Sequence, residues 1–334
     1  MMPIKLGKIA LIFSVSLAVI LAGELFVRFA LGLGTPPLTI KHPTIEYMFR
    51  PGQDVYRFGN HILINQYGMR SEDFPAKYSG SDEIRVMVFG DSVLNGGSQI
   101  GHENLATTLL SQQIAQSQNR QVTVGNISAG SWGPGNWLAY AKEYGFFDAN
   151  IVLLVLSSDD YADNPSFAPL NLNTHPVRRP KSALTEALSR YLPMFWNKWV
   201  VRRNENHDES QAATQKASSE DIEQGLQDLK DFLTLARTES QTVIVFLHLE
   251  KQELELGQFK EGHYKIIELC EQLGISAISS EPFYRESISR GINIYRDEIH
   301  TTEAGQKVLA DAIFSSLKGP VLRNKKLIND RQGG

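Results

Sequence analysis

The stretch Ile84-Arg85-Val86-Met87-Val88-Phe89-Gly90-Asp91-Ser92 decides the fold of this chain. Its first six residues are mostly apolar and end at a glycine, which is typical of a buried strand in a parallel sheet. The serine therefore stands at the carboxyl edge of the sheet, where open α/β folds place their ligands. Asp297-Glu298-Ile299-His300 lies near the other end of the chain. Together the two segments supply a nucleophile, a general base and a carboxylate that can orient the base.

These two segments resemble the motifs of the SGNH (GDSL-type) hydrolases, in which Gly-Asp-Ser opens the domain and Asp-x-x-His closes it. Val93 replaces the usual leucine after the serine. The resemblance covers roughly residues 84–317 and implies a serine esterase that needs no cofactor. It implies Ser92 as the nucleophile, His300 as the general base and Asp297 as the group that orients the base.

Strand-like and helix-like segments alternate between the two motifs. Together with the resemblance they predict an α/β chain with a flavodoxin-like three-layer α/β/α sandwich and a mainly parallel five-stranded sheet. A helix is predicted directly after the histidine, over 302–317. The strands are expected near residues 84–89, 121–125, 151–156, 242–248 and 275–279.

A second family motif places part of the oxyanion hole, the group of donors that stabilises negative charge in the transition state. The family has an asparagine, then four residues, then a glycine whose backbone N–H is one of these donors. Here the count from Asn126 reaches Ser131, with Gly130 one residue earlier. We expect the amides of Ser92 and of Gly130 or Ser131 to bind the oxyanion, because a backbone donor needs no particular side chain.

A third family motif, Gly-x-Asn-Asp, reads Ser157-Ser158-Asp159-Asp160 in this chain. Asp159 thus stands where the family has an asparagine that donates to the oxyanion. An ionised carboxylate cannot donate, and losing one such donor typically costs about 10²–10³ in rate. Three interpretations stay open: burial keeps Asp159 protonated, Asn164 or a serine hydroxyl replaces it, or catalysis is weak or lost.

Several further residues near this sheet edge are candidates for a substrate wall. Trp132 follows the second motif, Asn164 follows the third, and His248 ends the fourth predicted strand. Core packing is the alternative for Trp132, and a hydrogen-bonded structural role is the alternative for His248. An insertion at about 161–219 forms either a lid or wall over the serine or an unrelated surface excursion. We expect an aromatic helix-like segment at 191–199 and a flexible polar run at 204–219 within it.

The N-terminus predicts where the chemistry takes place. Residues 9–23 carry no charge, and after Glu24 the apolar character resumes as far as Leu31. Lys5 and Lys8 precede the run and no convincing cleavage site follows it. This pattern favours a single-pass anchor in the inner membrane, with the main domain facing the periplasm or cell exterior. A cleaved signal peptide and a buried core helix are the alternatives.

Four parts are expected along the chain: a membrane anchor at 1–31, a connector with a small hairpin at 32–80, the hydrolase-like domain at 81–320, and a polar tail at 321–334. The net charge of -4 gives no reason to propose nucleic acid as a partner. A single cysteine, Cys270, excludes an intramolecular disulfide. The histidines show no metal-ligand spacing, so neither a metal nor a cofactor is expected.

The expected function is that of a serine esterase or O-acyltransferase acting on small acyl esters, commonly acetyl esters. An outward-facing anchored enzyme would meet exported polysaccharide, so acylated carbohydrate is the preferred substrate, and polysaccharide export or acylation proteins are the candidate partners. The alternative is a catalytically weak or silent SGNH-fold scaffold of a polysaccharide export or modification assembly, in which Asp159 spoils the oxyanion hole.

Overall fold

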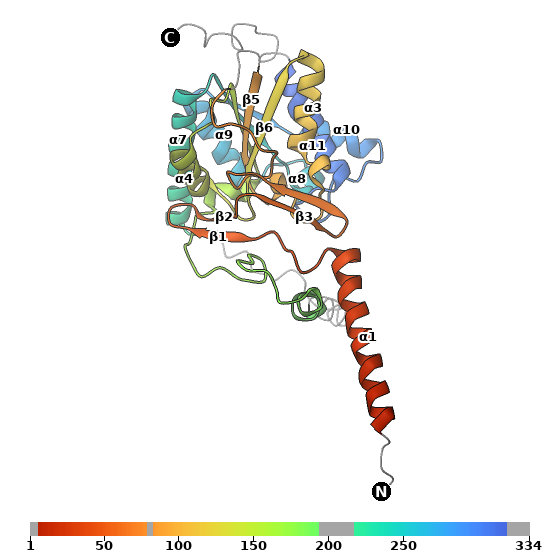
Figure 1. The fold of residues 1–334 in the computed structure, drawn as a ribbon. Helices are drawn as coiled ribbons and strands as arrows, with labels where there is room; N and C mark the ends of the chain where they lie inside the picture. The colour runs from red at the N-terminus through yellow and green to blue at the C-terminus, as the bar shows by residue number, and fades with distance from the viewer. Residues whose placement is uncertain (1–5, 79–82, 194–216, 319–334) are drawn as a thin grey trace.

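A computed structural model describes residues 6–78, 83–193 and 217–318 of the chain (Figure 1). The expected polar tail at 321–334 lies outside these residues. Only residues 191–193 of the expected aromatic segment at 191–199 are described, and only residues 217–219 of the expected polar run at 204–219. The described part consists of an α/β body from which one long helix projects (Figure 1).

The centre of the body is a five-stranded parallel sheet with strand order β6-β5-β7-β8-β9. Every residue of β5 and β7 is buried, because each has a strand on both sides and helices on both faces. β5 is the first of these strands in the sequence but lies between β6 and β7 in the sheet. The next strand, β6, lies on one side of β5, and the strand after it, β7, lies on the other side. This reversal of strand order creates a topological switch point at the carboxyl end of β5. This arrangement confirms the predicted flavodoxin-like fold class. The strands are β5 (Glu83–Gly90), β6 (Gln121–Ser128), β7 (Ile151–Leu156), β8 (Thr242–Leu247) and β9 (Ser276–Ser279).

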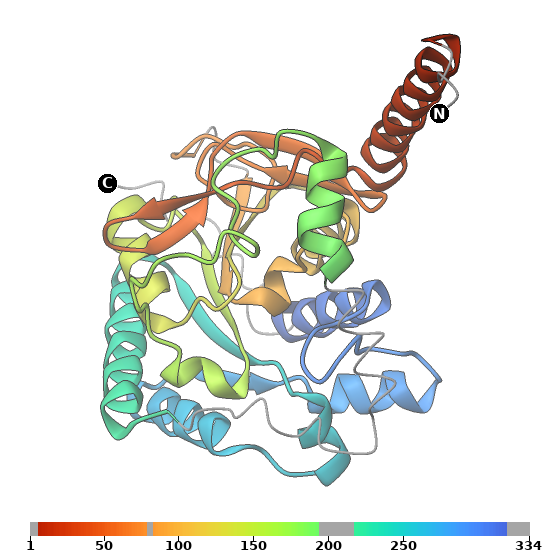
Figure 2. The same cartoon turned by 90° about the horizontal axis from the view of Figure 1, so that it is seen from below.

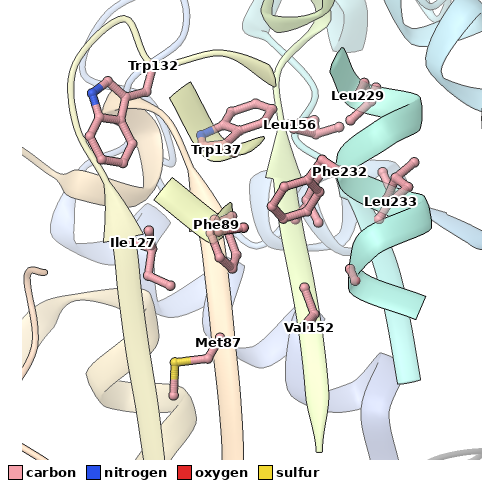
Figure 3. Packing of buried hydrophobic residues seen from close by; sticks show 14 of the residues in the cluster. Met87, Phe89, Ile127, Trp132, Trp137, Val152, Leu156, Leu229, Phe232 and Leu233 are labelled. Atoms are coloured by element: carbon pink, nitrogen blue, oxygen red, sulfur yellow. The ribbon is translucent and has the colours of Figure 1, made fainter. Parts of the chain in front are cut away.

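Helices cover the two faces of the sheet and enclose two apolar cores. Figure 3 shows one core, where Phe89 of β5 packs with Trp137 and Phe232 from the covering helices. Burying one side chain of this kind stabilises the fold by about 1.5–3 kcal/mol. On this face lie α4 (Pro134–Tyr144), α7 (Ser219–Glu239) and α9 (Glu261–Leu273), and on the other lie α3 (Ala106–Gln118) and α11 (Glu303–Lys318).

Short helical segments occupy the loops that connect the strands to these helices. α2 follows β5 directly and contains the serine of the first motif. These segments are α2 (Ser92–Asn95), η1 (His102–Asn104), η2 (Ser158–Ala162), α5 (Ala183–Glu186), η3 (Ala187–Tyr191), α8 (Lys251–Leu256) and α10 (Glu281–Ser289).

Three glycines allow neighbouring elements to approach the loop that follows β7, which contains η2. A β-carbon on Gly262 of α9 would lie 1.8 Å from the Ser158 carbonyl oxygen. One on Gly225 of α7 would lie 2.0 Å from the Tyr161 carbonyl oxygen. Gly133, before α4, meets the backbone of this loop in the same way, with 1.8 Å to the Asp163 carbonyl oxygen. The loop is therefore fixed on three sides by backbone contacts that exclude any side chain.

The N-terminal segment forms two antiparallel strand pairs and the projecting helix α1 (Leu6–Leu31). The predicted hairpin is present as β3 (Gln53–Arg57) and β4 (Asn60–Ile64), and both residues of its two-residue turn have positive φ, as a tight hairpin requires. A second pair, β1 (Thr39–His42) with β2 (Glu46–Phe49), was not predicted. Both pairs lie at the end of the body from which α1 leaves (Figures 1 and 2).

Helix α1 spans 26 residues, which corresponds to a length of about 39 Å. Its segment Gly7–Leu31 has a mean hydropathy of 2.4 in its most apolar window, and no residue of that window is buried in the body. The helix is thus long and apolar enough to cross a bilayer, whose hydrocarbon core is about 30 Å thick. A signal sequence would have the same composition.

Candidate active site

Ser92 is the first residue of α2, at the carboxyl end of β5 and at the switch point of the sheet. Asp91 precedes it as the N-cap, and the Asp91 carboxylate accepts a hydrogen bond of 2.8 Å from the Val93 N–H. A β-carbon on Gly90 would lie 2.9 Å from the Leu94 β-carbon, so the turn out of the strand has no room for a side chain. The Gly-Asp-Ser sequence therefore has a local structural reason as well as a chemical one.

The structure brings Ser92, His300 and Asp297 into one hydrogen-bonded chain. The Ser92 hydroxyl oxygen lies 2.9 Å from His300 Nε2, and His300 Nδ1 lies 2.9 Å and 3.0 Å from the two carboxylate oxygens of Asp297. Because the carboxylate accepts from Nδ1–H, the neutral ring presents its Nε2 lone pair to the serine. This is the geometry that removal of a proton from a serine nucleophile requires.

Asp297 is held ready as an anion by its own loop. Burial alone would raise the pKa of Asp297, but the backbone N–H groups of His300 and Ile299 and the His300 ring outweigh it and lower that pKa below its usual value. These amides lie 2.7 Å and 3.1 Å from one carboxylate oxygen. The same residue thus shapes the loop and orients the imidazole ring.

His248 does not line a substrate cavity, contrary to the prediction that it could form part of the wall. Its ring is fully buried, with Nδ1 2.8 Å from the Tyr284 hydroxyl and Nε2 2.8 Å from the Ile299 carbonyl oxygen. Burial lowers the pKa of His248 to about 4, so the ring is neutral. It supports the backbone one residue before His300, which corresponds to the structural alternative.

A cavity of about 440 Å³ contains Ser92 and His300. Gly130 and Ser131 line it beside them, as the family motif implies for oxyanion donors. Ser131 has φ of +55°, a left-handed conformation that glycine adopts without strain, and it occupies the position where the family has glycine. The Gly130 carbonyl accepts a hydrogen bond from the Tyr47 hydroxyl, which fixes this loop against β2.

Asp159 lies elsewhere: its side chain is exposed, and it does not belong to the lining of this cavity. The interpretation that burial keeps it protonated is therefore wrong. Its neighbour Asp160 is the buried one, and its carboxylate accepts a 2.7 Å hydrogen bond from the Ser157 N–H to cap η2. Whether Asp159 takes part in the chemistry stays a prediction.

Two buried carboxyl groups, Asp91 and Asp160, and the half-buried Asp163 influence one another next to the serine. Burial raises the pKa of Asp91 to about 6, against the Val93 amide and the nearby His300, which lower it. Burial, with Asp91 and other carboxylates nearby, raises the pKa of Asp163 to about 7 and that of Asp160 well above its usual value. The sheet edge below the nucleophile thus carries less negative charge near neutral pH than its sequence indicates.

Neither Trp132 nor Asn164 lines the cavity, although both were predicted as candidates. Trp132 is buried, its indole N–H donates to the Tyr47 carbonyl oxygen at 3.1 Å, and its ring packs near Tyr140, which is the core role given as its alternative. The Asn164 amide nitrogen donates to the Asp221 carbonyl oxygen at 2.7 Å. That donor therefore joins the loop after η2 to α7.

Other walls of the cavity come from segments in which the sequence showed no site. The connector contributes Tyr47 and Arg57, and the insertion contributes His175 and Arg190. The insertion thus forms a wall over the serine, one of its two predicted alternatives. No local pattern marks these residues, because they are brought together only by the way β1–β4 and the insertion fold across the sheet edge (Figure 2).

Comparison with known proteins found similar structures but no similar curated sequence. No protein-family model and no curated protein matches the chain. A member of the lipolytic protein G-D-S-L family from Veillonella parvula is 13% identical, with 71% of this chain and 99% of that chain covered and a TM-score of 0.41. A catalytic mutant of an acetylxylan esterase from Geobacillus stearothermophilus is 11% identical, with 70% of this chain and 94% of that chain covered and a TM-score of 0.43. A putative GDSL-like lipase from Parabacteroides merdae is 10% identical, with 71% of this chain and 97% of that chain covered and a TM-score of 0.46.

Proposed function

We propose that this protein is a membrane-anchored SGNH-type serine esterase that acts on small acyl esters, with transfer to a sugar hydroxyl as its variant reaction. The observation that carries the proposal is the hydrogen-bonded chain Ser92–His300–Asp297, whose members come from opposite ends of the domain. It opens into a cavity of suitable size at the carboxyl edge of the sheet.

In the proposed mechanism the Ser92 oxygen attacks the ester carbonyl carbon while His300 Nε2 takes the hydroxyl proton. The carbonyl oxygen becomes an oxyanion that accepts hydrogen bonds from the amides of Ser92 and of Gly130 or Ser131. The bond to the alcohol oxygen then breaks, and His300 returns the proton to the departing alkoxide. Water attacks the acyl-enzyme with His300 again as base and releases the acid, or a sugar hydroxyl attacks in the same way and accepts the acyl group.

The substrate class and the location belong to the same proposal. The cavity is lined by Pro36 and Pro37, just after α1, and by residues of β1 and β2. These two strands lie at the end of the body from which α1 leaves (Figure 1). An anchored enzyme with this orientation would act on acyl groups of exported carbohydrate close to the membrane surface. Polysaccharide export or acylation proteins are the partners that this location favours.

Covalent labelling tests the nucleophile directly. Full-length protein in detergent, treated with a fluorophosphonate, is expected to gain one adduct on Ser92 by intact-protein and peptide mass spectrometry. Ser92→Ala should abolish both the adduct and the hydrolysis of 4-nitrophenyl acetate. His300→Ala should slow acylation by roughly 10³-fold or more, since members of a triad act as a unit. Ser289→Ala, which removes an exposed hydroxyl on α10, is the matched control.

A silent scaffold is the second candidate, and one observation favours it: the residue at the family's oxyanion asparagine position is Asp159, whose carboxylate cannot donate. In that case Ser92 stays unlabelled in a folded sample and the wild type does not turn over the acetate. Because the Asp159 side chain is exposed and outside the cavity lining, Asp159→Asn would raise activity from a dead background only if the loop after β7 brings this position to the oxyanion. Labelling of the wild type at Ser92 would exclude the scaffold.

A further inference from the structure

The cavity around Ser92 has an unusual charge. Within the described part of the chain it is lined by four arginines and two histidines, and by no aspartate or glutamate. Clefts lined by one sign of charge concentrate ligands of the opposite sign. A neutral acetyl ester gives no reason for such a lining. The arginines are Arg57, Arg70, Arg190 and Arg296, and the histidines are His175 and His300.

On the side towards α1, two arginines share one carboxylate. Arg57 forms a buried ion pair with Glu186, and Arg190 reaches the same Glu186 oxygen at 3.4 Å. The second Glu186 oxygen also accepts a hydrogen bond of 2.7 Å from the Gly34 N–H. One negative charge therefore faces two positive ones, and the side chain of Arg190 remains 24% exposed. This wall keeps a net positive charge.

Arg70 adds a buried cation. It is 1% exposed, and its guanidinium group donates to the carbonyl oxygens of Asn95, Gly97 and Ile100. Among the described residues no carboxylate lies within ion-pair distance of it, and its Nε–H has no hydrogen-bond partner. Burial lowers the pKa of Arg70 to about 9, which still leaves it charged at neutral pH.

Arg296 stands beside the catalytic base. It directly precedes Asp297, its Nε lies 3.7 Å from an Asp297 oxygen, and its terminal nitrogen donates to Gln99 at 2.9 Å. Its side chain is 33% exposed. Asp297 already accepts hydrogen bonds from His300 and two backbone amides, so this guanidinium is available to a ligand in the cavity.

We propose that the ester taken by this site is carried on an acidic sugar, whose carboxylate binds Arg296 and Arg190 while the acyl group reaches Ser92. The inference rests on the proposed function and adds the substrate class to it. A cavity of about 440 Å³ is far larger than an acetyl group, so most of it receives the alcohol portion. Arginine suits this task because its planar guanidinium matches a carboxylate with two parallel hydrogen bonds.

A matched pair of substrates tests the proposal on the full-length protein in detergent. O-acetylated oligogalacturonate and the same oligomer with its carboxylates methyl-esterified differ in the charge of each carboxyl group and in one added methyl group, and released acetate is measured. We expect kcat/KM to be about tenfold or more higher for the charged form at low ionic strength, and the preference to shrink at high salt. Arg296→Gln and Arg190→Gln should each reduce the ratio of the two kcat/KM values about fivefold, mainly through KM of the charged form.

Arg285→Gln is the control, because Arg285 is an exposed arginine of α10 that pairs with Glu281 outside this cavity. It should leave the ratio unchanged. Equal kcat/KM for the two oligomers, or a preference that neither arginine variant alters, would overturn the proposal. If the proposed esterase function is itself wrong, the protein will not hydrolyse 4-nitrophenyl acetate, so this outcome is distinguished from failure of the substrate-class proposal. Calorimetric binding of non-acetylated oligogalacturonate to Ser92→Ala, against its methyl ester, then still decides whether the cavity selects acidic sugars.

Discussion

Asp163 carries a carboxyl group that the fold makes costly to ionise. Its pKa is raised from 3.8 to about 7, first by burial and then by Asp91 and other carboxylates nearby. The folded state therefore binds the proton more tightly than the unfolded state. The corresponding stability is present in full below about pH 4 and is lost as the pH rises towards 7, because the unfolded chain then releases the proton more readily.

Asp163→Asn should remove this loss, since an amide does not ionise. The variant is expected to gain free energy of unfolding relative to the wild type between about pH 5 and about pH 8, on the order of a few kcal/mol. Urea unfolding of both proteins at the two pH values measures it. Asp231→Asn, on the exposed face of α7, removes the same charge without the burial. A wild type and Asp163→Asn that respond identically to pH would contradict the assignment.

Some residues of the candidate site could be predicted from the sequence alone, and others could not. Ser92, Asp297 and His300 were predicted because two short motifs resemble those of one family and keep its order. Arg296 could not be recognised, although it adjoins Asp297, because an exposed arginine has no distinguishing pattern. Asp159 shows the opposite difficulty: a motif position predicts a role, but only the folded loop shows that its side chain is exposed.

At the scale of elements, continuous runs of apolar residues allowed the central strands to be predicted from the sequence. β7 is apolar throughout, and β5 is apolar except for Glu83 and Arg85, because both faces of these strands are covered. Their predicted ranges lie within two residues of the observed ones. β1 and β2 were missed because each has four residues and a mixture of polar and apolar side chains. The cavity walls depend on how such weak elements pack across the sheet edge, which is a non-local property.

The loop after β7 yields a prediction at this scale. Gly262→Ala and Gly225→Ala should each destabilise the protein by about 1–3 kcal/mol, because the added methyl group overlaps a backbone carbonyl that cannot move freely. Thermal or urea unfolding measures the effect. Glu223→Ala, an exposed position on the same helix as Gly225, is the control and should stay within about 0.5 kcal/mol of wild type. If alanine were tolerated at both glycines, the close backbone contacts would be wrong.

At the scale of the whole molecule, α1 is joined to the body through polar contacts at its end. The Glu24 carboxylate accepts hydrogen bonds of 3.0 Å and 2.7 Å from the N–H groups of Ala183 and Leu184, the first residues of α5. Arg28 pairs with the same carboxylate. The Leu31 carbonyl accepts a hydrogen bond of 2.9 Å from the Phe58 N–H in the β3–β4 turn. A cleavage within or after this helix would remove contacts that hold the insertion beside the cavity.

The topology of the chain can therefore be predicted as that of a retained anchor. Mature protein should keep its N-terminal segment, as read by intact-protein mass spectrometry, and should remain with membranes at high salt, because the exposed apolar side chains of α1 favour the bilayer over water. A reporter fused after Gly334 should be active only outside the cytoplasm, since Lys5 and Lys8 favour a cytoplasmic N-terminus. A soluble form beginning beyond Gly23 would show instead that the helix is a cleaved signal. Glu24→Ala gives an independent check: if α1 is kept, loss of the α5 cap should lower the thermal unfolding midpoint of the full-length protein, whereas a cleaved chain would not respond.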